Sequence, residues 1–500
     1  MTTVARKTLL LCAILSVVLF SSCGHSSDED SIVPFVSRDT QRDGFVYVQG
    51  HHFMLDGEPW FPLTLNYKTY ADNRGDSIVI APAPYYLSNS AAYDFAVIAD
   101  MGFNSIRLCV TGVETADTAA MYKAFERIID SAAQNNLRVM LLLDPPFDSA
   151  LVEYTSGLLR HFADNSTLWA YDFFNEPLYF DPKGEDRTKM EAYNIVSSWR
   201  EMMCQNAPNQ LFTVAFSEPI EVFEWDPTIM PVDFVEMHTY HPLRVASEMY
   251  WYSNVITNKP WMVGETSLPV DNDSVDYDEQ LHFMRQAFVL ARSMGAAGFG
   301  WWGYVDCTGE VNFEGKYTAL INSKKEKKPA AHEVKNLMGL LFGKELAKRP
   351  PNYYNMLGYN NICLKGQVID ENTGKPVCNA LIRGWTEDWI GMNTYSDSDG
   401  NFTLYSNDFC EHFEVSAPGM HTKKFDDHTL SYTFADSVPN HKWQYKSFPN
   451  KSLEYQSIDY HPFLEGDSLV LVFNPHFFNQ SKAQGNIGTI KLKCIKISDK

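Results

Sequence analysis

Residues 169–177 read Trp-Ala-Tyr-Asp-Phe-Phe-Asn-Glu-Pro, an apolar run that ends in a carboxylate and a proline. A short run of this kind, rich in aromatic residues, is typical of a buried β-strand followed by a turn. Strands of parallel sheets are covered on both faces, so they consist of nearly continuous apolar residues. We therefore predict a strand over Trp169–Asn175, with Glu176 just beyond its carboxyl end.

The same pattern recurs between about residue 45 and about residue 345, and helix-like stretches separate the apolar runs. Ala91–Met101 leads into Gly102, a helix stop, while Thr118–Gln134 and Asp278–Met294 are amphipathic. Eight alternating strand–helix units predict a closed TIM (β/α)8 barrel rather than an open sheet. The predicted strands are Phe61–Asn66, Ser105–Cys109, Arg138–Asp144, Trp169–Asn175, Leu211–Ser217, Asp233–His238, Trp261–Glu265 and Ala297–Trp302.

Catalytic groups of such barrels lie at the carboxyl ends of the strands. The predicted ends are Asn66, Arg107, Asp144, Asn175-Glu176, Ser217-Glu218, His238, Glu265 and Trp302. Glu176 and Glu265 follow strongly apolar strands, the fourth and the seventh. Two carboxyl groups about 5 to 5.5 Å apart can cleave a glycosidic bond with retention of configuration, one as acid and base and the other as nucleophile. These two glutamates are the natural candidates for such a pair.

The ordered strand ends resemble the catalytic domain of glycoside hydrolase clan A, especially its cellulase-like family five. The resemblance spans about residues 50 to 345 and is more specific as an ordered set than in any single block. The blocks that carry it are Leu55–Pro62 at the start, Gly102–Arg107 before an arginine, Asp172–Pro177 as the acid/base strand, Glu236–Tyr240 as the sixth strand, Pro260–Glu265 as the nucleophile strand and Gly298–Trp302 as the eighth strand.

This resemblance implies a retaining β-glycoside hydrolase that acts on a glycan of the β-glucan or β-mannan type, with no metal or other cofactor. Glu176 would be the acid/base, which must hold a proton before cleavage, and Glu265 the nucleophile. The implied substrate-binding residues are Asn175, Arg107, His238, Tyr240, Trp302, Asn66 and Asp144.

Individual roles follow from the same resemblance. Arg107 and Tyr240 would hold Glu265 ionised, and Asn175 would bond the sugar 2-hydroxyl, whereas His238 would orient Tyr240 or a sugar hydroxyl. Trp302 would floor the cleavage subsite. Trp301 points the other way along the strand and is expected to pack inside the protein.

Other interpretations stay open at this stage. Arg107 fits a buried ion pair, His238 an ordinary buried histidine, and Glu218 a substrate contact, a loop charge or a rival carboxylate. Asp144, His238 and His241 could form a metal site, although no His-x-His follows the first strand. The whole chain could also be a carbohydrate-binding lipoprotein that has kept the barrel and lost the chemistry.

One block departs from family five, where a histidine commonly follows the third strand. Here that place reads Leu143-Asp144-Pro145-Pro146-Phe147. The difference argues against a standard cellulase and leaves the sugar open.

The pattern changes after Arg349-Pro350-Pro351-Asn352 to short strands separated by turns. Residues 361–420 resemble a carboxypeptidase-regulatory-like β-sandwich, through Gly-x-Val-x-Asp, Thr-Gly-Lys-Pro-Val, Ser-Asp-Ser-Asp-Gly-Asn-Phe and Val-Ser-Ala-Pro-Gly in order. We expect an all-β sandwich to follow the barrel, with Ile487–Leu492 as its last strand.

The amino-terminal residues resemble a bacterial lipoprotein signal. Arg6 and Lys7 precede the apolar run Leu9–Phe20, which is too short to span a bilayer comfortably, and Phe20-Ser21-Ser22-Cys23 follows. Cys23 would carry a lipid that anchors the protein to a membrane. The acidic stretch behind it resembles the export tag of surface lipoproteins in Bacteroides-type bacteria, which implies a location in the cell envelope, at the outer membrane. An ordinary signal peptide cut nearby is the alternative.

The formal net charge of −21 makes nucleic acid an unexpected partner, because a polyanion is repelled by an acidic chain. The 500 residues exceed one barrel and fit a barrel with a smaller module. We divide the chain into a signal peptide (1–23), a polar tether (24–44), the barrel (45–346), a linker (347–360) and the β-sandwich (361–500).

Overall fold

The computed structural model describes residues 31–33, 41–75, 77–86, 88, 90–112, 118–143, 152–270, 276–306, 317–340, 349–356, 359, 362–385, 391–406, 410, 412–425, 432–434, 463–465, 468–470 and 483–497. Cys23 and Asp144, for which the sequence predicts a lipid anchor and a substrate contact, lie outside these residues.

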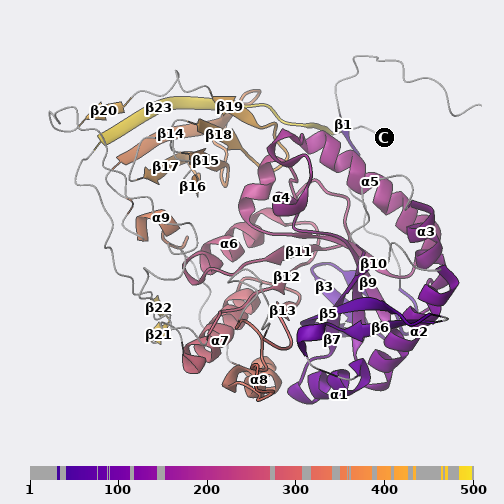
Figure 1. The fold of residues 1–500 in the computed structure, drawn as a ribbon. Coiled ribbons are helices and arrows are strands. Elements are labelled where there is room, and N and C mark those ends of the chain that lie inside the picture. Colours follow the sequence, from indigo (N-terminus) through magenta and orange to yellow (C-terminus); the bar gives the residue numbers. More distant parts are fainter. Residues whose placement is uncertain are drawn as a thin grey trace, which may run out of the picture.

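Eight parallel strands form a closed barrel, because the last strand pairs with the first: Phe299 lies beside Leu63 and Trp301 beside Leu65 (Figure 1). The predicted TIM barrel is therefore confirmed. In order around the barrel the strands are β5 (Leu63–Asn73), β7 (Ser105–Thr111), β8 (Arg138–Leu142), β9 (Leu168–Asn175), β10 (Leu211–Phe216), β11 (Val235–His238), β12 (Trp261–Glu265) and β13 (Phe299–Trp301).

The first strand is longer than predicted. β5 continues beyond Asn66 to Asn73, because its second half pairs antiparallel with β6 (Ile78–Pro82). The barrel wall is thereby extended on this side, past the level at which the sequence predicts the first strand to end.

Helices cover the outside of the barrel (Figure 1). They are α1 (Ala91–Met101), α2 (Thr118–Gln134), α3 (Val152–His161), α5 (Lys189–Asn206), α6 (Pro242–Val255), α7 (Tyr277–Ser293) and the short α8 (Pro329–Glu333). α1 ends as predicted at Gly102, whose φ of 106° is left-handed. A side chain at this position would also press on the backbone of Lys335.

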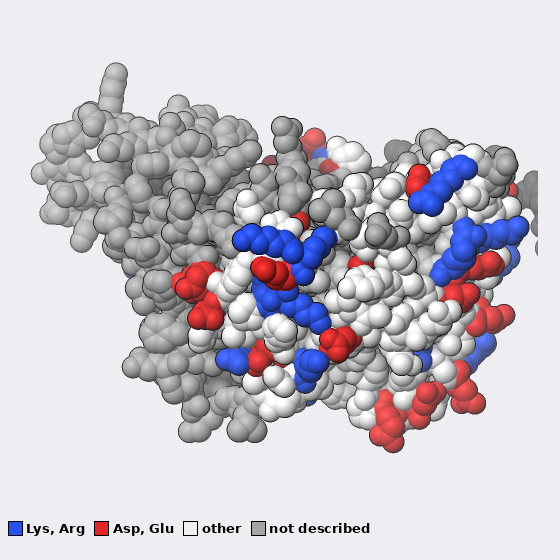
Figure 2. Space-filling model, turned by 60° about the horizontal axis from the view of Figure 1, so that its bottom comes forward, with Lys and Arg blue, Asp and Glu red and all other residues white. Residues whose placement is uncertain are grey.

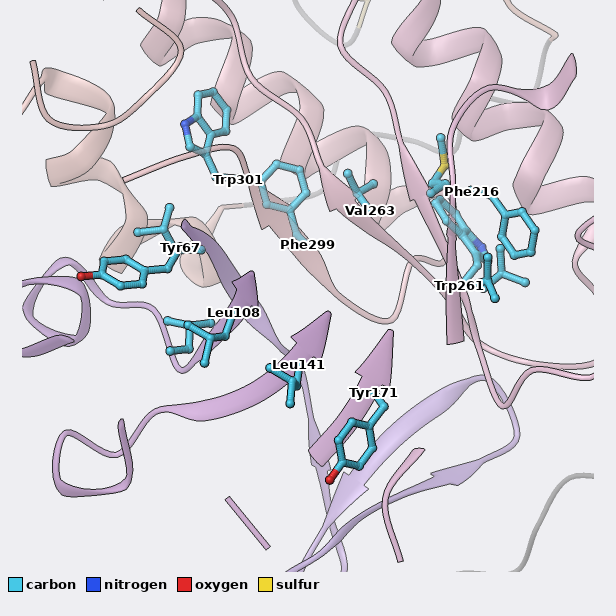
Figure 3. Packing of buried hydrophobic residues seen from close by; sticks show 14 of the residues in the cluster. Tyr67, Leu108, Leu141, Tyr171, Phe216, Trp261, Val263, Phe299 and Trp301 are labelled. Carbon is cyan, nitrogen blue, oxygen red and sulfur yellow. The ribbon is translucent and has the colours of Figure 1, made fainter. Parts of the chain in front are cut away.

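Apolar side chains on the outer face of the strands pack against these helices. Figure 3 shows Leu108 on β7, Leu141 on β8 and Val263 on β12 within this layer. Since side chains alternate along a strand, the residues next to them, such as Arg107, point into the barrel.

A small antiparallel sheet closes the amino-terminal end of the barrel. It consists of β2 (Val46–Gln49), β3 (His52–Leu55) and β4 (Glu58–Trp60). The ring of Phe53 lies 5.4 Å from that of Trp169 and 5.0 Å from that of Phe234, both at the starts of barrel strands. This end is filled mainly with apolar side chains, whereas the charged groups of the predicted site lie toward the carboxyl-terminal end.

Two four-stranded sheets, one mixed and one antiparallel, lie in the carboxyl-terminal region, and they share one buried apolar cluster. The prediction that all-β structure follows the barrel is confirmed, the likeness to a carboxypeptidase-regulatory-like sandwich stays a prediction, and the strand predicted over Ile487–Leu492 lies within β23. One sheet contains β17 (Asn401–Ser406), β14 (Ile362–Asp370), β23 (Ala483–Leu492) and β20 (Tyr432–Phe434), and the other β16 (Gly391–Tyr395), β15 (Leu381–Trp385), β18 (His412–Ser416) and β19 (Lys423–Phe425).

Buried charges join the sandwich to the barrel. Arg383 on β15 forms ion pairs with Glu224 of the barrel and, at 3.1 Å, with Glu414 of β18. Lys189 at the start of α5 lies 2.9 Å from Asp226 and donates to a carbonyl oxygen of the sandwich at 2.8 Å. Burying these charges together is favourable only in one geometry, so they fix the sandwich beside α4 (Pro177–Phe180) and α6 (Figure 1).

The described part of the predicted tether is also attached to the folded protein. Ser31–Ile32 (β1) pairs with Lys496–Ile497 (β24), and the side chain of Ile32 is buried. Elsewhere on the surface, acidic side chains lie among basic ones on the face in Figure 2, and Lys327 and Lys335 share Asp100. None of the helices within the described residues combines the length and apolar character that crossing a bilayer requires.

The interface makes a prediction for Arg383→Met. The substitution leaves Glu224 and Glu414 buried without their shared cation, so the free energy of unfolding should fall by about 3–5 kcal/mol, measured by urea denaturation at neutral pH. Lys424→Met is the matched control, because Lys424 pairs with the same Glu414 at 3.5 Å but is 60% exposed. The free energy of unfolding of Lys424→Met should fall by less than about 1 kcal/mol. Equal losses for the two variants would show that burial does not matter here.

Candidate active site

The structure gathers the predicted strand ends at one end of the barrel. Asn66, Arg107, Asn175, Glu176, His238, Glu265 and the nearby Tyr240 form one connected set of contacts. Trp302 follows β13 at the same end, where its backbone N–H donates to the carbonyl oxygen of Thr266. Most of the predicted site residues are thus brought together by the fold alone.

Arg107 on β7 is the centre of this set. Its side chain is 1% exposed, and Asp172 on β9 accepts from its Nη2 at 2.6 Å and from its Nε at 2.9 Å. The amide oxygens of Asn66 and Asn175 accept from its Nη1 at 3.0 Å and its Nη2 at 2.8 Å. Nη1 also lies 2.5 Å from Glu265 Oε1. The interpretation of Arg107 as a buried ion-pair partner is therefore correct, and one of its partners is the candidate nucleophile.

The surroundings keep Arg107 positively charged. Burial by itself lowers the pKa of the guanidinium, but the carboxylates of Asp172, Glu236 and Glu265 outweigh that effect and raise the pKa well above its ordinary value. A permanent positive charge therefore lies directly beside Glu265.

Glu265 ends β12 and receives a second donor. The hydroxyl of Tyr240 donates a short hydrogen bond to Glu265 Oε2, while Arg107 occupies Oε1. Burial and the nearby carboxylates of Glu265 and Glu176 raise the pKa of Tyr240 well above its ordinary value, so the phenol keeps its proton. Two fixed donors thus orient both oxygens of a carboxylate whose side chain is 5% exposed.

Glu176 stands at the turn between β9 and α4. Its φ of 47° is left-handed, and Pro177 begins α4 directly behind it. The backbone N–H of Glu176 donates to the carbonyl oxygen of Ala215 at 2.8 Å, which holds the turn against β10. One oxygen of Glu176 and one of Glu265 lie within 4.8 Å of each other.

His238 bridges the two glutamates. Its Nδ1 lies 2.7 Å from Glu176 Oε1 and 3.6 Å from Glu265 Oε2. The sequence predicted that His238 would orient Tyr240 or a sugar hydroxyl, whereas the structure places its ring against the acid/base candidate. Burial lowers the pKa of His238, but Glu265, Glu176 and Glu236 more than compensate and raise it to about 10.

The same three side chains have the spacing of a metal site. By distance alone, Glu176, His238 and Glu265 could hold an ion. With the pKa of its ring raised to about 10 by the surrounding carboxylates, His238 is protonated at neutral pH and pairs with Glu176. Of the alternative metal site, Asp144 lies outside the described residues, and His241 Nδ1 accepts a hydrogen bond from the backbone N–H of Leu243 at the start of α6.

The two tryptophans at the end of β13 have different surroundings. Trp301 is fully buried, and its Nε1 donates to the carbonyl oxygen of Thr318 at 3.2 Å, in agreement with its predicted packing role. Trp302 is half-buried, and the ammonium group of Lys68 lies 4.5 Å from its ring centroid.

Glu218, the possible rival carboxylate, belongs to a separate cluster. Its Oε1 accepts from the hydroxyl of Tyr179 at 2.8 Å and pairs with Arg244 Nη1 at 2.8 Å. Glu218 is therefore held at the edge of the barrel mouth, beside the exposed ring of Tyr179.

Two buried carboxylates of the site were not assigned a role from the sequence. Asp172 and Glu236 are both inaccessible to solvent and both face Arg107, Glu236 at 3.4 Å. Glu236 also lies 3.7 Å from His238 Nε2. A signal for them existed, because a charged residue inside an apolar strand needs a buried partner of opposite charge.

A third missed residue, Glu221, supports the turn after Glu176. Its Oε1 accepts from the backbone N–H of Leu178 and from the hydroxyl of Ser217, both at 3.0 Å. Burial raises the pKa of Glu221 to about 8, so the carboxyl is mostly neutral at pH 7. No local sequence signal identifies this contact, since it joins the loops after two different strands.

Comparisons with known proteins give the following matches. The chain matches no described protein family and no curated protein sequence. Among solved structures it aligns with the exo-β-1,4-mannosidase Op5Man5 from Opitutaceae bacterium strain TAV5 at 16% identity and a TM-score of 0.47, over 58% of this chain and 61% of that one. It aligns with the Faecalibacterium prausnitzii β-glucuronidase at 15% identity and a TM-score of 0.44, over 59% of this chain and 52% of that one.

A third structure is GH5_18 from Streptomyces cattleya, at 15% identity and a TM-score of 0.45, over 63% of this chain and 86% of that one. The chain spans less than two thirds of the length of the mannosidase and of the glucuronidase. At such identities the function of this chain has to be argued from the geometry of its own site.

The geometry predicts how Glu236 affects His238. Glu236→Gln removes one of the negative charges that favour the imidazolium, so the pKa of His238 should fall by about one unit or more. NMR titration of the protein labelled with ¹⁵N-histidine measures this, with His238→Gln to assign the resonance. Glu126→Gln is the control, because it removes a surface carboxylate that lies 2.7 Å from a different histidine, His161, and so should leave the pKa of His238 unchanged. An unchanged His238 titration in Glu236→Gln would contradict the electrostatic coupling.

Proposed function

We propose that the protein is a retaining β-glycoside hydrolase, with Glu265 as nucleophile and Glu176 as acid/base. The observation that carries the proposal is the pair of glutamates at the barrel mouth, with one oxygen of each within 4.8 Å of the other. Retaining enzymes place their carboxyl groups about 5–5.5 Å apart, whereas inverting enzymes need about 6.5–9.5 Å to fit a water molecule between them.

The contacts of the two glutamates support different roles. Both oxygens of Glu265 accept hydrogen bonds from groups that keep their protons, Arg107 and Tyr240, so Glu265 is held as an anion. An oriented carboxylate of this kind suits attack on the anomeric carbon. Glu176 lies nearer to solvent, with 15% of its side chain exposed, as expected for a group that protonates the departing glycosidic oxygen.

The proposed reaction proceeds in two displacements. Glu265 attacks the anomeric carbon while Glu176 gives its proton to the leaving oxygen, which forms a glycosyl ester and releases an alcohol. A water molecule then attacks the same carbon, Glu176 takes a proton from it, and the ester bond to Glu265 breaks. The β configuration is restored, and both glutamates return to their starting states.

His238 would act on Glu176 through their hydrogen bond. A cationic ring beside Glu176 stabilises its carboxylate form, which appears when the proton has left for the glycosidic oxygen. As the leaving group departs, the imidazolium therefore stays to balance the new negative charge. His238 is in this way a positioning and charge-balancing residue.

The remaining predicted residues surround the place of the sugar ring. Asn175 turns its amide oxygen to Arg107, so its amide nitrogen is the group directed to a sugar 2-hydroxyl. Trp302 offers a half-buried aromatic face. We propose a β-linked glycan of the glucan or mannan type as substrate, and no metal ion takes part in the proposed steps.

The nucleophile role predicts the effect of Glu265→Gln. The amide cannot form the glycosyl ester, so kcat on any glycan that the wild-type protein cleaves should fall on the order of 10⁴-fold or more. Glu201→Gln, at an exposed position of α5, is the matched control and should keep full activity. Survival of turnover in Glu265→Gln would refute the mechanism.

The wild-type rate should also be insensitive to a chelator, and ¹H NMR of the first product should show the β anomer.

The acid/base role predicts a different response for Glu176→Gln. Loss of the proton donor should slow cleavage of a glycan by about 10²–10⁴-fold. An aryl glycoside with a 2,4-dinitrophenyl leaving group needs no protonation, so its first displacement should be far less affected. Steady-state and pre-steady-state kinetics on both substrates measure the contrast. An equal loss on both would mean that Glu176 is not the acid.

A further inference from the structure

Lys68 occupies an unusual position at the mouth of the barrel. It lies on β5, two residues beyond Asn66, and side chains on a strand alternate between its two faces. Asn66 faces the site, where it contacts Arg107 and the carbonyl oxygen of Gly264, whereas Tyr67 points outward and is buried. Lys68 is therefore on the catalytic side of the strand, one step nearer to the opening than Asn66.

The backbone N–H and carbonyl oxygen of Lys68 are both hydrogen-bonded. Its N–H donates to the hydroxyl of Tyr86 at 3.0 Å, and its carbonyl oxygen accepts from Ala83 at 3.0 Å. These bonds exist because β5 runs past the barrel rim and pairs with β6. The side chain therefore starts from a fixed point, and its ammonium lies 4.5 Å from the centroid of the Trp302 ring.

This ammonium differs from the other sheltered lysines. Within the part of the chain that the structure describes, no carboxylate forms an ion pair with the half-buried Lys68. The buried lysines all have an oxygen partner: Lys189 with Asp226 at 2.9 Å, Lys328 with Asp306 at 2.9 Å, and Lys259 with the carbonyl oxygen of Met230 at 2.7 Å. A sheltered ammonium that has an aromatic ring but no carboxylate among its described neighbours has capacity for an anionic ligand.

We propose that Lys68 binds an anionic group, a carboxylate or a sulfate ester, on the sugar that stacks on Trp302. This inference rests on the proposed glycosidase function and adds to its substrate an acidic group, carried by the sugar at Trp302, that plain glucans and mannans lack. A neutral hydroxyl would leave the ammonium charge uncompensated, whereas a carboxylate or sulfate oxygen forms a charge-assisted hydrogen bond with it.

The test uses pairs of substrates that differ in one group. 4-Methylumbelliferyl β-D-glucuronide and β-D-glucoside differ at C6 by carboxylate against hydroxymethyl, and the same pair in the galacto and manno series covers other epimers. A 6-sulfated β-D-N-acetylglucosaminide and its unsulfated twin form the sulfate arm. We expect kcat/KM of the wild-type full chain to be higher for one anionic member than for its twin, and the arm that responds identifies the anion.

Lys68→Met should then lower kcat/KM on that anionic substrate at least about tenfold more than on its neutral twin. Lys68→Arg keeps the charge and should retain part of the preference. Lys123→Met, on the exposed face of α2, removes one charge far from the cleft and should leave the ratio unchanged. Melting temperatures of the variants separate a changed preference from a folding defect.

Two results would overturn the inference and remain distinguishable. If neutral glycosides are cleaved as well as their anionic twins, and Lys68→Met affects both equally, Lys68 does not recognise an anion although the proposed function stands. If neither the aryl glycosides nor a panel of β-glycans is cleaved, the proposed function fails. Titration calorimetry with glucuronic acid and glucose then tests whether Lys68 binds an anionic group, and equal affinity for the two sugars contradicts this role.

Discussion

A buried guanidinium organises the interior of the barrel. Arg107 is 1% exposed and meets Asp172 at 2.6 Å, Glu236 at 3.4 Å and Glu265 at 2.5 Å. A charge removed from water costs several kcal/mol unless its partners are placed accurately, so the strands that supply these carboxylates are held in position relative to β7. The position of Glu265 therefore follows from the stability of the fold as well as from its proposed chemistry. Removing any one carboxylate would disturb both.

The charges at the barrel mouth form one group whose balance matters for the proposed reaction. Within the described residues, the carboxyl groups are those of Asp172, Glu236, Glu265 and Glu176, and the cations between them are Arg107 and His238. With Glu176 protonated as the acid, three carboxylates face two cations. Lys68 adds a third cation, beside the Trp302 ring, so the mouth as a whole has no clear surplus of either sign. With Glu265 as the proposed nucleophile, its carboxylate is the negative group that would lie nearest the anomeric carbon. A transition state with oxocarbenium character develops positive charge at that carbon, so this carboxylate favours it over the neutral ground state.

Apolar periodicity was enough to predict the barrel, because each strand is covered on both faces and each helix on one. The strand ends then predicted which side chains would meet, since parallel strands of a closed barrel present their carboxyl ends together. Contacts across the barrel could not be predicted in this way. The pairing of His238 with Glu176 depends on the tilt of two strands, and the sequence suggested Tyr240 or a sugar hydroxyl as its partner instead. The length of β5 beyond Asn66 was missed because the turn at residues 74–77, which joins β5 and β6 in a hairpin, was not recognised in the sequence, and Lys68 was missed with it.

The sandwich is connected to Glu176, the proposed acid/base, through one short segment. The 3-10 helix η4 (Pro219–Phe223) follows β10, and its Glu221 accepts from the backbone N–H of Leu178, two residues after Glu176. The outer side of the same segment belongs to the domain interface, where the carbonyl oxygen of Phe223 accepts from Thr422 of the sandwich at 2.9 Å. Arg383 lies 4.1 Å over the Phe223 ring and pairs with the next residue. A single rigid element thus contacts the turn that presents Glu176 on one side and the sandwich on the other. The turn that presents Glu176 and the carboxyl-terminal sheets therefore meet the same packed segment, so a change at the interface would reach the proposed acid/base through few contacts.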